Sequence, residues 1–445
     1  MKIIVLGGGI IGVSTAWHLL ERGHDVTVVE RQSNAALETS FANAGQISVS
    51  YCEPWASRDA PLKLLKWMFR RDAPLLFRPQ LDWQQWRWGL RFLNQCNDAA
   101  FERNVQQILA LGVYSHEALK EVVRATGIEF NRLERGIAHY FTDQKSLDGA
   151  GAAATLMRQY GVQRRVVSTA EMLRIEPAFK AFASRIVGAT YTASDESGDA
   201  CVFTQALALR GAARGAQFLY EHAVERLEKI GDTIESVAIR RCGPMVTDTN
   251  LINLKADAVV VACGSYTAPL LQSVGVDLPI YPGKGYSATL RILQPERAPL
   301  VSTIDDEVKC AFTRLGDQLR VAGTIELGGY DLSLDNPLSK ARCRMLVERV
   351  EAVLPGVCDT RSAELGGEPR FWTGLRPATP TNIPYIGKTK VRKLWVNAGH
   401  GTLGWTHGAG SGKAIAELIS GERPDMEFGF YGFDPADRGS ERRFS

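Results

Sequence analysis

The feature that most constrains this chain is a glycine pattern near its start. An apolar run over residues 2–6 predicts a buried strand, and residues 7–12 follow with the spacing G-x-G-x-x-G. A helical pattern then covers residues 10–22, and residues 25–30 predict a second strand that ends in Glu30. A strand, glycine turn, helix and acid-terminated strand together predict a dinucleotide-binding unit.

Each part of this unit has a physical role. Gly7 permits the tight turn, Gly9 lets the backbone approach a pyrophosphate, and Gly12 lets the helix pack closely on the strand. The start of the helix, at Ile10 and Ile11, favours an anion because its backbone N–H groups point outward. The motif serves NAD and FAD alike, so it does not choose between them.

Two later segments favour FAD. Residues 256–265 read as a buried strand ending in small residues, including Ala262 and Gly264, where such proteins pass the adenine half of the cofactor. Residues 397–408 form a glycine-rich loop ahead of a helical run, so that backbone N–H groups and the helix dipole can face the negative charge of a reduced flavin. Dinucleotide elements at both ends of the chain suit one long ligand.

The length of 445 residues exceeds what one core usually supports, so we expect two intertwined domains. A formal charge of +3 is too small to indicate nucleic acid as the main partner. The eight cysteines are scattered without metal-ligand spacing, which predicts no metal site and a reducing compartment. With no signal peptide and no membrane span in the sequence, we expect a cytoplasmic protein.

The chain alternates between segments of different character. From about residue 56 it becomes helical, basic and Trp-rich, and from residue 203 a helix and an antiparallel meander return. We therefore predict an α/β fold, with a Rossmann-like FAD-binding domain that carries a meander and an inserted α+β substrate domain. The predicted FAD-binding domain comprises 1–55, 195–285 and 365–430, the substrate-binding domain 56–194 and 286–364, and a surface tail 431–445.

Five further segments are specific: ETSFANAGQ at 38–46, DESGD at 195–199, YPGKGYS at 281–287, WTGLRPATP at 372–380, and the loop at 399–412. With the glycine fingerprint, they resemble the D-amino-acid dehydrogenase branch of the D-amino-acid oxidase-like flavoprotein family over nearly the whole chain. Small departures, at Ser197, Ala200 and Gly283, bear on the substrate rather than on the cofactor.

The resemblance implies which residues hold FAD. Adenosine, pyrophosphate and flavin would be held by Glu30, Arg31, Ser40 and Gln46, with the backbone of Asn43, Ala44 and Gly45, and Val224 would lie on the adenine side. The isoalloxazine would be faced by Gly399, His400, Gly401, Thr402, Leu403, Gly404 and Thr406. No cysteine falls in a segment tied to the ring, so we expect non-covalent FAD.

Three side chains are candidates for the chemistry. Arg376 would anchor a substrate carboxylate through its planar fork. Tyr286 would supply a hydroxyl or pack in the core, and His400 would donate to the cofactor or simply pack. For His139 and Tyr140, in the inserted domain, core packing is the better interpretation.

The expected reaction is hydride transfer from Cα of a D-amino acid to flavin N5, giving a 2-oxo acid and ammonia after hydrolysis, with a quinone or similar acceptor taking the electrons. The alternative is an oxidase for glycine, sarcosine or a D-hydroxyproline-type secondary amine. An NAD-binding module is disfavoured by the C-terminal loop, and an RNA-modifying flavoenzyme by the weak net charge.

Residues 55–93 combine tryptophan with basic residues and few acids. Such a mixture suits peripheral contact with the inner face of the bacterial plasma membrane, where a quinone would be reached. The alternative, which we favour from sequence, is an amphipathic surface with its tryptophans packed inward. The tryptophans and basic residues are Trp55, Lys63, Lys66, Trp67, Arg70, Arg71, Arg78, Trp83, Trp86, Arg87, Trp88 and Arg91.

Overall fold

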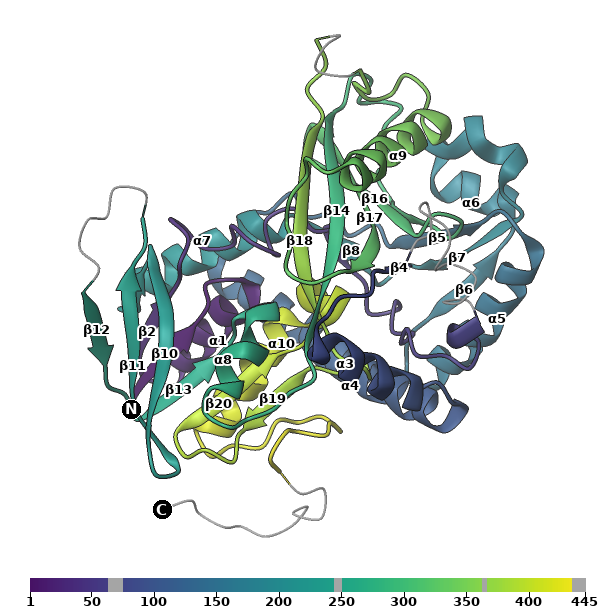
Figure 1. Ribbon diagram of the computed structural model, residues 1–445. Helices are drawn as coiled ribbons and strands as arrows, with labels where there is room; N and C mark the ends of the chain where they lie inside the picture. The colour runs from purple at the N-terminus through teal and green to yellow at the C-terminus, as the bar shows by residue number, and fades with distance from the viewer. Residues whose placement is uncertain (63–74, 244–249, 362–365, 434–445) are drawn as a thin grey trace.

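Two lobes form the molecule in the computed structural model, which describes residues 1–62, 75–243, 250–361 and 366–433 (Figure 1). One lobe is built on a six-stranded, mostly parallel sheet and the other on a nine-stranded mixed sheet. The architecture confirms the predicted fold class. It also brings distant parts of the chain together, because strands from the beginning, middle and end share the first sheet.

The six-stranded sheet is parallel except at β19, which runs antiparallel to β20. Its central strands are almost wholly buried, as expected where both faces are covered. Helices α1, α7 and α10 pack together on one side of the sheet. On its other face, apolar side chains of the sheet and of a three-stranded meander form one core. In sheet order the strands are β19 (Tyr385–Lys388), β20 (Leu394–Ala398), β13 (Ala258–Val261), β1 (Lys2–Leu6), β2 (Asp25–Val29) and β9 (Gln217–Leu219); the meander is β10 (His222–Ile230), β11 (Thr233–Arg241) and β12 (Leu251–Leu254); the helices are α1 (Ile10–Glu21), α7 (Ala200–Ala213) and α10 (Gly404–Ile419).

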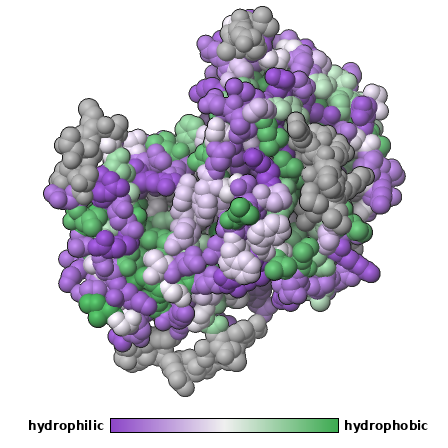
Figure 2. Space-filling view, in the orientation of Figure 1, coloured by the Kyte–Doolittle hydropathy of each residue, from purple (hydrophilic) through white to green (hydrophobic). Residues whose placement is uncertain are grey.

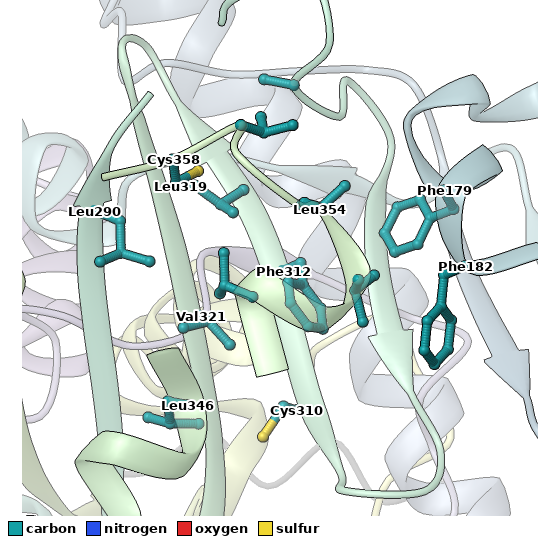
Figure 3. Close-up of a cluster of buried hydrophobic side chains, with 14 of the residues drawn as sticks. Phe179, Phe182, Leu290, Cys310, Phe312, Leu319, Val321, Leu346, Leu354 and Cys358 are labelled. Carbon is teal, nitrogen blue, oxygen red and sulfur yellow. The ribbon is translucent and has the colours of Figure 1, made fainter. Parts of the chain in front are cut away.

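The nine-stranded sheet carries α9 (Pro337–Val353) on one face, and Figure 3 shows apolar side chains of the strands meeting those of α9 and the segment after it. Phe179 and Phe182 reach this core from a neighbouring 3-10 helix. The strands, in order, are β18 (Arg370–Ala378), β14 (Tyr281–Arg291), β17 (Gln318–Leu327), β16 (Cys310–Leu315), β15 (Ser302–Asp305), β5 (Ile137–Phe141), β7 (Gly188–Thr192) and β6 (Arg164–Val167), with β4 (Leu75–Phe77) beside β17.

The remaining elements connect or cover the lobes. Two short strands, β3 and β8, pair with each other and join segments 149 residues apart near the cavity described below. They are β3 (Gln46–Ile47) and β8 (Glu196–Ser197); the helices are α3 (Trp83–Asn94), α4 (Asp98–Thr126), α5 (Gln144–Gln159), α6 (Thr169–Ile175) and α8 (Thr267–Gln272), with 3-10 helices η1 (Pro177–Arg185), η2 (Gly264–Tyr266) and η4 (Gly401–Leu403).

The lobes do not divide at every predicted boundary. Strands β14 and β18 pair along their length in the nine-stranded sheet, although residues 281–285 and 370–378 were expected in the cofactor domain. Helix α4, expected in the substrate domain, packs on α10, where Ser115 Oγ accepts from the Gly410 N–H at 2.9 Å. Residues 434–445 of the expected tail lie outside the described residues.

Candidate active site

A cavity of about 1520 Å³ is lined by residues from both lobes. This exceeds the roughly 300–1,000 Å³ usual for small-ligand sites, so a long cofactor and a substrate can share it. Every residue predicted to contact the cofactor lines this cavity except Gly12 and Gly399. These two glycines are chain neighbours of lining residues, Gly12 of Ile11 and Gly399 of His400. Arg376, Tyr286 and His400 are also in its wall.

The glycine turn forms one end of the cavity and leaves no room for side chains. Gly7 has φ +106°, and a Cβ there would lie 2.6 Å from the Ala262 carbonyl oxygen. A Cβ on Gly12 would lie 1.9 Å from the Gly7 carbonyl oxygen. The α1 helix begins here without a side-chain cap at Gly9, and Ser40 Oγ accepts from the Ile10 N–H at 3.1 Å. This cradle fits a pyrophosphate on the helix N-terminus.

Glu30 and Arg31 shape the adjoining part of the cavity. Glu30 follows β2, and its Oε2 accepts from the Gly8 N–H at 2.6 Å, while burial raises the pKa of this carboxyl. The Arg31 guanidinium lies 4.0 Å from the centroid of the Tyr266 ring. Val224, on β10, lines the same region. A fixed acid at the end of the second strand is the arrangement that binds ribose hydroxyls in dinucleotide sites.

The segment at residues 43–46 is held in place by hydrogen bonds that its own side chains make. Asn43 Oδ1 accepts from the Gly45 N–H at 2.9 Å, and Gln46 Nε2 donates to Ser302 Oγ at 2.8 Å. Gly45 has φ +68°, and a Cβ there would lie 3.2 Å from the Gly198 carbonyl oxygen. The segment therefore crosses from one lobe to the other with its backbone along the cavity wall.

The C-terminal loop forms the wall near the start of α10. His400 is 2% exposed, and neither ring nitrogen has a hydrogen-bond partner in the described chain. Burial, together with the nearby His407, holds the pKa of His400 well below its usual range, so its imidazole is neutral. The α10 helix begins at Gly404, and Thr406 Oγ1 accepts from the Ser48 N–H at 3.0 Å. An unpaired buried imidazole beside a helix N-terminus fits a polar, electron-rich ring system.

Arg376 lies in the wall contributed by β18. Its guanidinium crosses Gly285 of β14, where a Cβ would lie only 2.4 Å from the Arg376 Cζ. Nη1 donates to the Thr324 carbonyl oxygen at 2.8 Å, and no carboxylate of the described residues pairs with it. Burial lowers the pKa of Arg376 to about 10. A partly buried cation that lines a cavity and has no anion beside it favours an anionic ligand there.

Tyr286 does not direct its hydroxyl to this cation. The hydroxyl donates to Glu326 Oε2 at 2.7 Å and lies 3.2 Å from Ser339 Oγ, on the α9 side of the sheet. Tyr51, which the sequence interpretation missed, lines the cavity instead, and its hydroxyl is close enough to raise the pKa of Arg376 against the effect of burial. Its only sequence signal is its position just beyond the segment ending in Gln46.

A set of polar and charged side chains forms another part of the wall. His139 Nε2 lies 3.2 Å from Asp306 Oδ1, which also pairs with Lys309, and Arg164 Nη1 lies 3.3 Å from Glu53 Oε1. Burial lowers the pKa of His139. His139 thus lines the cavity, contrary to the preferred interpretation from sequence.

Its neighbour Tyr140 behaves as expected. Tyr140 is fully buried in the core of the nine-stranded sheet, and its hydroxyl donates to Asp305 Oδ2 at 2.5 Å. Adjacent residues of β5 point to opposite faces, which explains why one lines the cavity and the other does not.

Comparisons with known proteins agree with this geometry. The family model described as FAD dependent oxidoreductase matches residues 2–418. A D-amino acid dehydrogenase of Dechloromonas aromatica (strain RCB) is 48% identical, covering 97% of this chain and 99% of the relative, and one of Rhizobium rhizogenes is 42% identical, covering 96% and 98%.

Among solved structures, glycine oxidase from Geobacillus kaustophilus aligns with a TM-score of 0.71 at 21% identity, covering 96% of each chain. L-proline dehydrogenase from P. horikoshii aligns with a TM-score of 0.69 at 18% identity, covering 96% of this chain and 94% of that one. The fold is thus shared well beyond clear sequence similarity. With the glycine cradle, the flavin-sized cavity and the match over nearly all of its length, the chain belongs to the DAO family of FAD dependent oxidoreductases.

Proposed function

We propose that this protein oxidises D-amino acids at Cα, yielding 2-oxo acids and ammonia, and passes the two electrons to an acceptor other than oxygen. The observation that carries the proposal is the partly buried Arg376 guanidinium, which lacks a carboxylate partner in the described chain and lies in the cavity with the dinucleotide cradle. The names of the relatives that are 41–48% identical support the D-amino acid as substrate.

The residues have distinct roles in this reaction. When bound, FAD supplies the acceptor for the hydride that leaves Cα. Arg376 binds the substrate carboxylate through its fork, and the Tyr51 hydroxyl donates to the same group. The substrate ammonium first gives its proton to solvent, so the amine is neutral when the hydride leaves and no strong base is needed at Cα. Water then hydrolyses the imino acid to the 2-oxo acid and ammonia. Neutral His400 and the first turn of α10 would stabilise negative charge that develops on the bound cofactor.

The test is a substrate panel assayed anaerobically with an artificial dye. Dye reduction with D-amino acids but not with L-enantiomers supports the proposal, whereas turnover restricted to glycine, sarcosine or cyclic secondary amines would replace it. Arg376→Met should raise KM and lower kcat/KM by a factor on the order of 10², corresponding to roughly 3 kcal/mol for an unpaired carboxylate. Peroxide formed in air at the rate of dye reduction would indicate an oxidase.

We also propose that the cofactor is held without a covalent bond. Of the described cysteines, Cys263 lines the cavity, but its thiol lies near Leu6 O at 3.3 Å, at the Glu30 end. Burial raises the pKa of this thiol to about 12, which keeps it protonated and unreactive. Acid precipitation should leave the yellow colour in the supernatant; colour in the pellet would contradict the proposal.

The electron acceptor is proposed to be a membrane quinone, reached through α3. The helix buries Trp88 and Phe92 but exposes Trp83 (70%) and Leu90 (64%), so its tryptophans divide between core and surface rather than all packing inward. Figure 2 shows pale and green side chains together near the centre of this face, in the region where Figure 1 places α3. The exposed apolar residues are Leu81, Trp83, Trp86, Leu90 and Leu93.

Several features support peripheral contact with the inner face of the plasma membrane. Arg87 and Arg91 stand on the same helix and both pair with Asp277, which leaves this group with a net positive charge that suits an anionic surface. Trp55 and Leu75, in the same part of the chain, line the cavity, so this surface adjoins the active site. No helix in the described ranges is long and apolar enough to cross a bilayer. Lys63, Lys66, Trp67, Arg70 and Arg71 lie outside the described residues.

A further inference from the structure

Thr324 has a backbone conformation that its residue type disfavours. Strand β17 pairs with β14 through Gly285 opposite Ile325 and Tyr286 opposite Gly323, which leaves Thr324 as the extra residue of a bulge. Its φ is +52°, in the left-handed region where β-branched residues are rare and glycine is at ease. Such strain persists where the surroundings hold it, and it gathers at functional sites.

The backbone of this bulge faces Arg376. The Thr324 carbonyl oxygen accepts the 2.8 Å hydrogen bond from Arg376 Nη1 and so fixes one arm of the guanidinium. Glycine at this position could present the same carbonyl without strain. The backbone role therefore does not explain why a threonine stands here.

The side chain of Thr324 can explain why a threonine stands at this position. Thr324 lines the cavity and is only 3% exposed, yet its Oγ1 has no hydrogen-bond partner among the described residues. Buried hydroxyls are normally paired, because leaving one unpaired forfeits its hydration. Because Thr324 stands in the cavity wall and its carbonyl holds Arg376, its unpaired hydroxyl is available to a group bound against that guanidinium.

We propose that the Thr324 hydroxyl donates a hydrogen bond to the substrate carboxylate that Arg376 anchors. The hydroxyl would complete, with the guanidinium fork, a set of donors around the two carboxylate oxygens. The bulge thus serves the site twice: its carbonyl orients the cation and its side chain contacts the anion. This inference rests on the proposed carboxylate-binding role of Arg376.

The test measures carboxylate binding without turnover. Propionate, which lacks an amine, is titrated into the holoenzyme while the flavin absorbance is followed. Thr324→Val keeps the β-branched shape and removes the hydroxyl, so the Kd for propionate should rise about tenfold or more, as expected for a lost hydrogen bond to a charged group. Thr324→Ser keeps the hydroxyl and should stay within about threefold of the wild type.

Thr303 provides a matched control. It is fully buried on β15, its Oγ1 also lacks a partner in the described chain, and it does not line the cavity. Thr303→Val should therefore leave the Kd for propionate unchanged, with full flavin content in every variant. In turnover, Thr324→Val should raise KM much more than it lowers kcat.

Two outcomes would overturn the inference: an unchanged Kd in Thr324→Val, or an equal loss in Thr324→Ser, which would assign the effect to the backbone. Arg376→Met separates this failure from that of the proposed function. If Arg376→Met weakens propionate binding while Thr324→Val does not, only the role of Thr324 falls. If Arg376→Met leaves binding unchanged, the carboxylate site itself is misplaced.

Discussion

At the scale of single residues, the burial of Arg376 has a consequence for pH dependence. Burial lowers the pKa of this guanidinium to about 10, so the free enzyme loses the cation as pH rises through that value. A carboxylate that binds the cation should therefore bind with constant affinity at neutral pH and about tenfold more weakly for each pH unit above 10. Propionate titrations between pH 7 and 11 should show the break, and Arg376→Met should abolish it. A flat profile through pH 11 would mean that the guanidinium stays charged.

The candidate residues differ in how well sequence could find them. Arg376 and the glycines could be found from sequence because they lie in short motifs in which the local backbone or the ligand requires those residue types. Thr324 was not, because its role depends on a bulge that long-range pairing of β14 and β17 creates, and Tyr51 was not, because only the folded chain brings it to the cavity wall. Tyr286 was misleading because its hydroxyl bonds Glu326 and lies near Ser339 of α9, contacts that depend on which elements pack together.

At the scale of elements, the first turn of α1 should not tolerate a methyl group. A Cβ on Gly12 would lie 1.9 Å from the Gly7 carbonyl oxygen, so Gly12→Ala must move the turn away from β1. We expect purified Gly12→Ala to retain less than about one tenth of the wild-type flavin, as judged from the ratio of visible to ultraviolet absorbance.

Gly211→Ala is the control for this variant. It also lies in a helix, α7, but a Cβ there would meet its nearest neighbour, a Leu20 methyl, at 3.6 Å, an ordinary contact. Its flavin content should equal that of the wild type, and its helix propensity should improve. Full flavin content in Gly12→Ala would show that the turn can adapt.

Glu196 of β8 ties α4 to the segment after it. Its carboxylate bonds His116 at 2.6 Å and Arg132 at 2.8 Å. Burial alone would raise the pKa of Glu196, but these hydrogen bonds outweigh it and lower the pKa to about 2. Because the folded-state pKa is below the unfolded value, the stabilisation is fully present above about pH 4.5 and is lost as pH falls through about 2.

Glu196→Ala should therefore lower the free energy of unfolding by about 3 kcal/mol near neutral pH, since it removes the buried acceptor of His116 and leaves Arg132 with only the exposed Glu134. The gap between wild type and variant, measured by urea denaturation, should narrow from pH 5 towards pH 2. Glu225→Ala, which removes a surface pair with Arg240, should change stability by less than about 0.5 kcal/mol. An equal gap at all pH values would contradict the role of the carboxylate.

The elements themselves were largely predictable, and their boundaries less so. The opening β1-α1-β2 unit follows from local pattern alone, and α1 begins at Ile10 as expected. Helix α7 begins at Ala200, earlier than its apolar pattern, because Asp199 caps it by accepting from the N–H groups of Cys201 and Val202. The sequence did not predict that β14 and β18 belong to the nine-stranded sheet. A strand joins the sheet that holds its pairing partners, and its own residues do not reveal which strands those are.

At the scale of the whole molecule, the two lobes need each other. The cradle for the cofactor belongs to the six-stranded sheet, while Arg376 and Thr324 belong to the nine-stranded one, so the cavity exists only when both are folded. The segment ending in Gln46 and the β3-β8 pair run between them. The cofactor cradle and the proposed carboxylate anchor thereby share one cavity.

The proposed membrane contact is tested on the same scale. The holoenzyme should float with liposomes that contain phosphatidylglycerol, and high salt should weaken the association because basic residues contribute to it. Replacing both Trp83 and Leu90 with Ser removes two exposed apolar side chains of α3 and should reduce binding at least about tenfold. Dye-linked activity should be unchanged, since neither residue lines the cavity.

Leu209→Ser is the matched control, because Leu209 is 73% exposed on α7, away from α3. It should float like the wild type, which would tie the association to one surface rather than to exposed apolar residues in general. If the wild type stays at the bottom of the gradient, or if Leu209→Ser loses as much binding as the α3 variant, then α3 does not dock on lipid. The quinone would then have to be reached from solution, and the exposed tryptophans would need another partner.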